Sequence, residues 1–234
     1  MNIAFVAARA VHFGTAMLLF GELLFASTVA SGAWRRAIAA APGMGGRLDR
    51  HVQIVSAWTL LASGASGAIW LAMEAASMAG TTIPQALDRG ALALVLRETE
   101  FGHVWLLRTI VFVVLAMSVL WMRRAMNDEK RSRRTGVTSL LAACYLATLA
   151  FAGHAAASSQ GAPRVLHLGS DVSHLLAAGA WLGGLPALIY CLRSQQPNDA
   201  LGPLTRRFSV LGIASVAVLV AGGIVNASFR ARRR

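Results

Sequence analysis

Three ionisable residues, His167, Asp171 and His174, open an apolar segment that spans residues 165–192. The segment is long enough to cross a bilayer, and an ionisable group inside hydrocarbon is costly enough to be a functional candidate by default. At about 100° per residue, the three positions fall within an arc of about 60° on a helix. They therefore predict one polar stripe, which needs a proton path, a metal ion or a haem as its partner.

The spacing within this stripe limits what one ion can take. His167 and Asp171 are four residues apart and Asp171 and His174 are three apart, so each pair can meet on one helical face. His167 and His174 are separated by about 10 Å along the axis, which is too far for two bonds of about 2 Å to one ion. Either the two histidines serve successive sites, or Asp171 accepts a hydrogen bond from one of them and fixes its tautomer.

The composition places this stripe in a polytopic membrane protein. Apolar residues make up 56% of the 234 positions and charged residues 14%, and the apolar residues form long blocks. Since a span needs about 20 mainly apolar residues, we expect an all-α helical bundle forming a single transmembrane domain over residues 1–234. The six predicted spans cover about 5–34, 52–79, 104–122, 137–157, 165–192 and 208–225. A short helix over about 84–96, with Pro84 in its first turn, is expected to lie along the outer surface.

The distribution of the basic residues predicts the orientation. A net charge of +12 would favour nucleic acid as the partner of a soluble chain, but here the lysines and arginines concentrate after the first, third and fifth spans. By the positive-inside rule these loops are cytoplasmic and the N-terminus faces outward. We therefore expect a lipid bilayer around the chain and no nucleic acid. The basic tail, 230–234, departs from the rule.

Five of the six histidines fall on the outer side in this topology. The connection 158–164 is short, so His154 and His167 must be close in space. Neutral imidazole is the commonest metal ligand, and several imidazoles with one carboxylate suit copper or zinc. The predicted metal site consists of His12, His154, His167, Asp171 and His174. We interpret His51 and His103 as interfacial side chains.

A route through the membrane is also suggested. Glu22 lies about 15 Å deeper than His12 along the same helix, where it could relay protons or carry a cation inward. A carboxyl bonded to a neighbouring helix is the other interpretation. Methionine thioethers favour Cu(I), and the possible transport path consists of Glu22, Met17, Met73, Glu74 and Met78.

Other residues in the spans suggest structural roles. Arg108 lies about one turn inside the third span and is interpreted as a clamp that pairs with Glu74 or Glu100. Gly179 and Gly183 form a G-x-x-x-G pattern, which allows close helix approach. The two cysteines, Cys144 and Cys191, are interpreted as small buried apolar residues, with soft ligation of a cuprous ion as the alternative.

The chain resembles the copper resistance protein D (CopD/PcoD) family of bacterial inner-membrane proteins. The resemblance rests on Arg9 and His12 in the first span, on the 101–108 segment with Arg108, and on Gly153 and His154 ending the fourth span. Its most specific part runs from His167 through Asp171 and His174 to the sequence AWLGGL at 180–185. Relatives in this family usually continue through further spans, so the resemblance implies a C-terminally shortened member.

The family resemblance implies copper homeostasis or resistance, with transfer of copper across the inner membrane towards the cytoplasm. It also implies a periplasmic copper-binding partner of the CopC type. The alternative function is a b-type haem protein, with His12 and His174 as the axial ligands, and a third hypothesis is a membrane scaffold with incidental histidines. We find no nucleophile with a base, no Walker loop and no nucleotide fingerprint, so we do not expect an enzyme.

Overall fold

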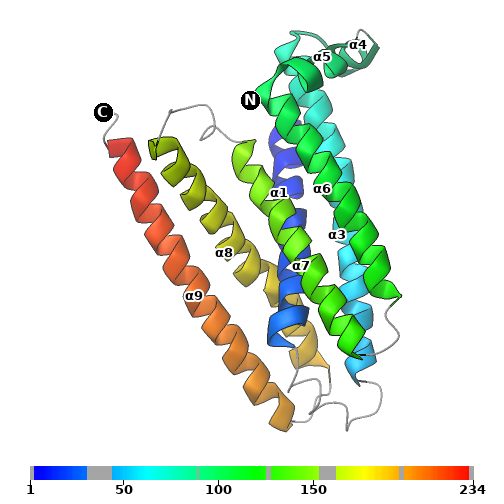
Figure 1. Cartoon of the computed structure of the whole chain (residues 1–234), viewed down its shortest axis with the longest axis vertical. Coiled ribbons are helices and arrows are strands. Elements are labelled where there is room, and N and C mark those ends of the chain that lie inside the picture. Colours follow the sequence, from blue (N-terminus) through cyan, green and yellow to red (C-terminus); the bar gives the residue numbers. More distant parts are fainter. Residues whose placement is uncertain are drawn as a thin grey trace.

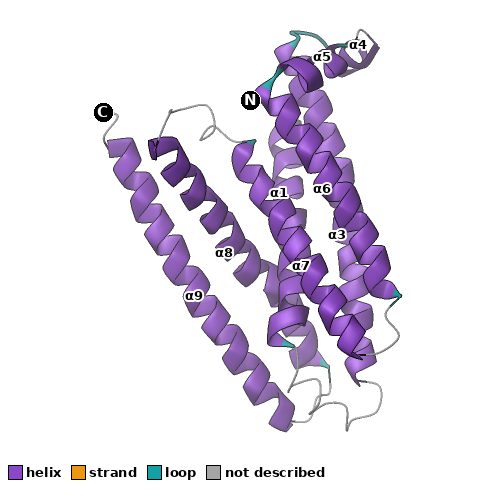
Figure 2. Cartoon of the chain, viewed as in Figure 1, coloured by secondary structure: helices purple, strands orange, loops and turns teal. Residues whose placement is uncertain are grey.

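The computed structural model describes residues 3–30, 44–88, 90–124, 128–152, 162–194 and 198–231. In these ranges the chain is almost entirely helical, with short turns between helices, and it contains no strand (Figure 2). The elements are α1 (Ile3–Leu24), the π-helix η1 (Phe25–Val29), α3 (Met44–Met78), α4 (Ile83–Asp88), α5 (Ala91–Glu98), α6 (Glu100–Arg123), α7 (Asp128–Phe151), α8 (Ala162–Arg193) and α9 (Asn198–Ala231). In the described part of the chain, six helical segments are long and apolar enough to cross a membrane. The predicted polytopic helical bundle is therefore confirmed.

The helices extend further than the apolar blocks that predicted them. α3 begins at Met44, whereas the second span was expected to begin at residue 52, and α6 begins at Glu100 instead of residue 104. Hydropathy marks where a chain enters hydrocarbon, but backbone hydrogen bonding continues the helix through polar turns on either side. The ends of two predicted spans, residues 31–34 and 153–157, lie outside the described residues.

The expected single helix over 84–96 is two helices, α4 and α5, at one end of the bundle (Figure 1). Gly90 between them has φ +70°, a left-handed conformation that interrupts a right-handed helix and that glycine adopts without steric cost. Thr99 then caps α6, because its side-chain hydroxyl accepts a hydrogen bond from the Gly102 backbone N–H at 2.9 Å.

α1 occupies the centre of the bundle and packs against α3, α7 and α8, while α9 packs mainly on α8 (Figure 1). The contact between α1 and α8 is made by glycines. A Cβ atom added to Gly183 would collide with the Met17 carbonyl and with Gly21, and one added to Gly179 would collide with Leu146 and Phe20. The two backbones can therefore approach only because these positions carry no side chain.

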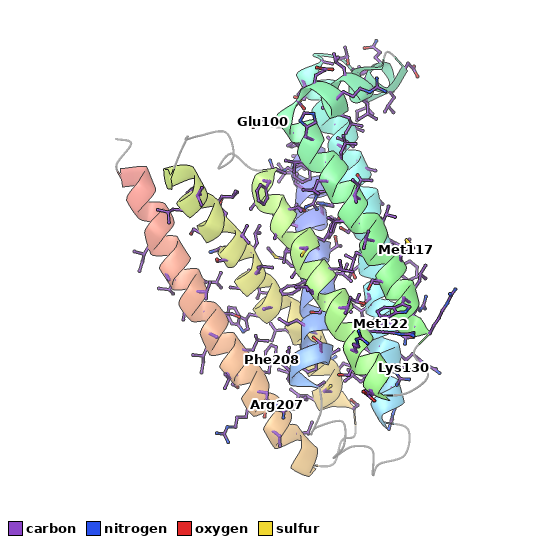
Figure 3. The ribbon with its side chains drawn as sticks, viewed as in Figure 1. Glu100, Met117, Met122, Lys130, Arg207 and Phe208 are labelled. Carbon is purple, nitrogen blue, oxygen red and sulfur yellow. The ribbon has the colours of Figure 1, made fainter. Side chains whose placement is uncertain are left out.

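The two ends of the bundle differ in charge. The N-terminal end of α1 and the C-terminal end of α9 lie at the same end, together with α4 and α5 (Figure 1). Basic residues gather at the opposite end, where Figure 3 labels Lys130 and Arg207 far from Glu100. There Arg131 pairs with Asp49 at 2.5 Å, and Arg207 donates a hydrogen bond to the Val29 carbonyl at 3.3 Å. This separation is consistent with the sorting of charge in the sequence.

Candidate functional site

His12, on α1, lies at the centre of a cluster of aromatic rings from three other helices. Its side chain is completely buried, with an exposed fraction of 0%. The ring centroids of Trp70 on α3 and Trp105 on α6 each lie 5.7 Å from the imidazole, and that of Tyr145 on α7 lies 6.2 Å away. The histidine predicted to open an outer metal site is therefore part of the bundle core.

Both ring nitrogens of His12 are engaged in hydrogen bonds. Nε2 lies 2.7 Å from Nη2 of Arg108, and Nδ1 lies 2.9 Å from the carbonyl oxygen of Ser63. A guanidinium can only donate, so Nε2 accepts; a carbonyl can only accept, so Nδ1 carries the proton. In this arrangement neither nitrogen is available to a metal ion or to a haem iron.

Arg108 is a buried cation, 1% exposed, held by neutral groups. Besides its bond to His12, it donates to the Tyr145 carbonyl at 3.1 Å and to the Thr148 hydroxyl at 2.5 Å. Its guanidinium carbon also lies 4.5 Å from the centroid of the Tyr145 ring, within the range of a cation–π interaction. Glu74, one of the two carboxylates expected to pair with it, accepts a hydrogen bond from Trp70 at 3.4 Å.

Several partners in this network were not predicted from the sequence, namely Ser63, Trp70, Tyr145 and Thr148. The sequence does contain a pattern that could have indicated one of them, Ser63. Small hydroxyl residues recur at positions 56, 59, 63 and 66 of the second span, which is the period of one helical face. This stripe could have been paired with the His12 imidazole, which needs hydrogen-bond partners inside the bundle and finds them at Ser63 and Ser66.

The predicted stripe on α8 lies on another side of the bundle. His167 and Asp171 are half-buried and His174 is exposed. A Cβ atom added to Gly222 of α9 would lie 3.8 Å from His174 Nδ1, so His174 lies beside α9, whereas His12 contacts α3, α6 and α7. The structure does not bring these two histidines into one site. His154 lies outside the described residues.

Within the ranges that the structure describes, no three His, Cys, Asp or Glu side chains are close enough to hold a metal ion together. The residues of the predicted path are spread along the bundle. Met17 is half-buried at the crossing with α8, Met73 and Glu74 are half-buried on α3, and Met78 is 49% exposed. His103, at the end of the bundle that bears α4 and α5, donates a hydrogen bond from Nε2 to the Arg97 carbonyl at 2.8 Å.

Two residues with expected buried or interfacial roles have different surroundings from those predicted. Cys144 is exposed, whereas Cys191 is buried, so the expected burial of Cys144 is wrong. Its side of α7 faces away from the other helices, where an apolar side chain needs no protein neighbour in a bilayer.

His51 is also not a simple interfacial side chain. Its Nε2 lies 3.6 Å from a carboxylate oxygen of the fully buried Glu22.

The described residues form six long apolar helices, and a buried histidine–arginine pair lies among four of them, which together define a multi-pass membrane protein with a polar core. Residues 1–165 match the family described as Copper resistance protein D-like, N-terminal domain. The chain belongs to this family, which confirms the resemblance seen in the sequence. The matched region contains α1 to α7 and therefore the His12–Arg108 pair, and it ends just after α8 begins.

Individual relatives agree with this assignment. Copper resistance protein D of Pseudomonas syringae pv. tomato is 31% identical, over 96% of this chain and 69% of the relative. Inner membrane protein YebZ of Escherichia coli (strain K12) is 27% identical, over 97% of this chain and 72% of the relative. Copper transport protein CutJ of Bacillus subtilis (strain 168) is 28% identical, over 80% of this chain but only 34% of the relative. No solved structure matches the chain significantly.

Proposed function

We propose that this chain is an inner-membrane protein of copper homeostasis and resistance, with its N-terminus in the periplasm, that binds copper at the outer end of α8 and moves it inward. Membership of the copper resistance protein D-like family is the observation that carries the proposal. Two relatives are named as a copper resistance protein and a copper transport protein, which supports the proposal, and the third is named as an inner membrane protein. We further propose that the spans form one transmembrane domain.

The proposed copper ligands lie in the first half of α8. His167, Asp171 and His174 recur on this helix at the spacing that lets neighbouring pairs share an ion, and His154 belongs to the same proposed set. His12 can join these ligands only by giving up its hydrogen bond with Arg108. A periplasmic protein of the CopC type would deliver copper to this end.

The proposed route inward follows the contact between α1 and α8. Met17 lies at this crossing, and Glu22 lies further along α1, fully buried. Thioether sulfur suits Cu(I), and a carboxylate provides negative charge in the low-dielectric interior. Met73, Glu74 and Met78 would form a second set of possible contacts near the outer end of α3.

Metal analysis of the detergent-purified protein tests the proposal. After loading with Cu(I) under ascorbate and removal of unbound metal, we expect stoichiometric copper in the natural chain. In the His167→Ala/His174→Ala double variant, the ion at the outer end of α8 should be held at least about tenfold more weakly, whereas His103→Ala, a change at another histidine of the same end, should match the natural chain. Equal copper affinity in the two variants would contradict the proposed site, and a Soret band in the absorption spectrum would indicate the haem alternative.

A further inference from the structure

A second pair of candidate ligands lies towards the end of the bundle that carries the basic residues. Glu22 of α1 is 0% exposed and His51 of α3 is 20% exposed, and Oε1 of the carboxylate lies 3.6 Å from Nε2 of the imidazole. Both carboxylate oxygens of Glu22 and Nε2 of His51 are buried without a hydrogen-bond partner. Three buried polar atoms, contributed by two adjacent side chains, therefore lack a hydrogen-bond partner.

The buried carboxylate needs a positive charge beside it, which either a proton on the His51 imidazole or a metal ion bound by both side chains can supply. A carboxylate inside a bilayer is expensive unless it is neutralised. The 3.6 Å separation is longer than an ordinary hydrogen bond of about 2.7–3.2 Å. Two ligands that each bind one tetrahedral ion at about 2.1 Å are separated by about 3.4 Å. The pair therefore has the spacing of two ligands of one metal ion.

The surroundings hold the imidazole in place and give it access to solvent. The His51 ring stacks on Tyr190 of α8, with centroids 4.1 Å apart and an angle of 13° between the planes. His51 and Tyr190 also line an open cavity of about 440 Å³, with Gly46, Arg47, Arg50 and Ile54. His51 lines this cavity, whereas Glu22 does not. An ion held by the pair could thus exchange with the solution through the His51 side.

We propose that Glu22 and His51 form an inner cation site that holds a transition-metal ion before its release at the basic end of the bundle. No third His, Cys, Asp or Glu side chain in the described ranges completes the ligand set, so the remaining positions are filled from the cavity. Arg47 and Arg50, which line the cavity, favour an anionic ligand at these remaining positions, such as a small thiolate or carboxylate. The assignment of the ion as copper rests on the function proposed above; the presence of a cation site does not.

Binding of Zn²⁺ and of Cu(I) to the purified full chain tests this inference. The measurements are made in the His167→Ala/His174→Ala background, so that the outer site is weakened. We expect one ion to remain bound there, and Glu22→Gln and His51→Gln each to weaken its binding at least about tenfold. His103→Gln provides the matched control, because it alters a histidine at the other end and should leave the affinity unchanged.

X-ray absorption of the bound zinc gives a readout that does not depend on affinity alone. We expect imidazole scattering in the background protein and its loss in the His51→Gln variant, with thermal unfolding checked to show that each variant is folded. If no ion depends on Glu22 and His51, the inner site is wrong. This result leaves the outer site to be judged by its own copper measurement, so the two proposals fail separately. Zinc binding without Cu(I) binding would overturn only the assignment of the ion as copper.

Discussion

The Arg108 guanidinium donates a hydrogen bond of 2.7 Å to the His12 imidazole inside the bundle. This contact joins α6 to α1, and the other hydrogen bonds of the two residues extend the connection to α3 through Ser63 and to α7 through Thr148. Four helices therefore meet through one polar pair. In a bilayer, such a pair also favours one arrangement of these helices over others, because an arrangement that left its polar groups without partners would be costly.

We predict strong energetic coupling between His12 and Arg108. In a double-mutant cycle with His12→Ala and Arg108→Ala, measured by denaturant unfolding in detergent micelles, the coupling free energy should be about 1.5–3 kcal/mol. A control cycle that pairs His12→Ala with Arg97→Ala should give a value near zero. Additive effects of His12→Ala and Arg108→Ala would show that the hydrogen bond does not contribute to stability.

The close approach of α1 and α8 should fail when a methyl group is added at their contact. We expect Gly183→Ala to lower the free energy of unfolding by about 1–3 kcal/mol, since its Cβ would collide with the backbone of α1. Gly169→Ala is the matched change on the same helix, where nothing lies within 4 Å of the added atom. It should raise the stability by about 0.5–1 kcal/mol through helix propensity. Equal effects of the two substitutions on unfolding would argue against a glycine-dependent contact.

The start of α6 should depend on the hydroxyl of Thr99. Thr99→Ala removes the hydrogen bond from the Gly102 N–H and should cost about 0.5–2 kcal/mol of stability. Thr99→Ser retains the hydroxyl and should therefore retain most of the stability that the alanine variant loses. Hydrogen exchange at the amides of the first turn provides a local measurement, and faster exchange is expected in the alanine variant only.

Thiol labelling of intact cells should report the orientation. In a Cys144→Ser/Cys191→Ser background, a cysteine placed at Leu94, which is 63% exposed on α5, should react with a membrane-impermeant reagent from outside. A cysteine at Arg124, at the opposite end of α6, should react only after permeabilisation. The reverse pattern would show that the basic end faces the periplasm and would overturn the proposed periplasmic N-terminus.

The spans were predictable from the sequence because hydrocarbon imposes a minimum length of apolar chain. Their helical ends were not, since the polar turns of α3 before residue 52 carry no hydropathy signal. The break at Gly90 was missed for a related reason. Glycine is compatible with a helix and with the left-handed conformation, and only the packing of α5 against α6 decides between them.

Residue types alone marked His12, Glu22 and Arg108 as unusual within spans, because ionisable groups are rare in hydrocarbon. Their partners were harder to predict. The hydroxyl stripe of α3 and the backbone carbonyls of Ser63 and Tyr145 are common features of helices, and nothing in a one-dimensional pattern says which of them will face a given imidazole or guanidinium. For the same reason, the sequence did not indicate that His51 would lie beside Glu22, and His51 was interpreted as interfacial.

The sequence by itself determined the membrane class, the family and the list of polar side chains that need partners, because each follows from local composition and periodicity. The tertiary structure alone decided which partners they have. In the bundle, His12 faces Arg108 and not His174, and Glu22 faces His51. These pairings arise because the glycine contacts between α1 and α8 set the rotation of α1 about its axis. Rotation about a helix axis depends on all neighbouring surfaces together, and no single helix encodes it.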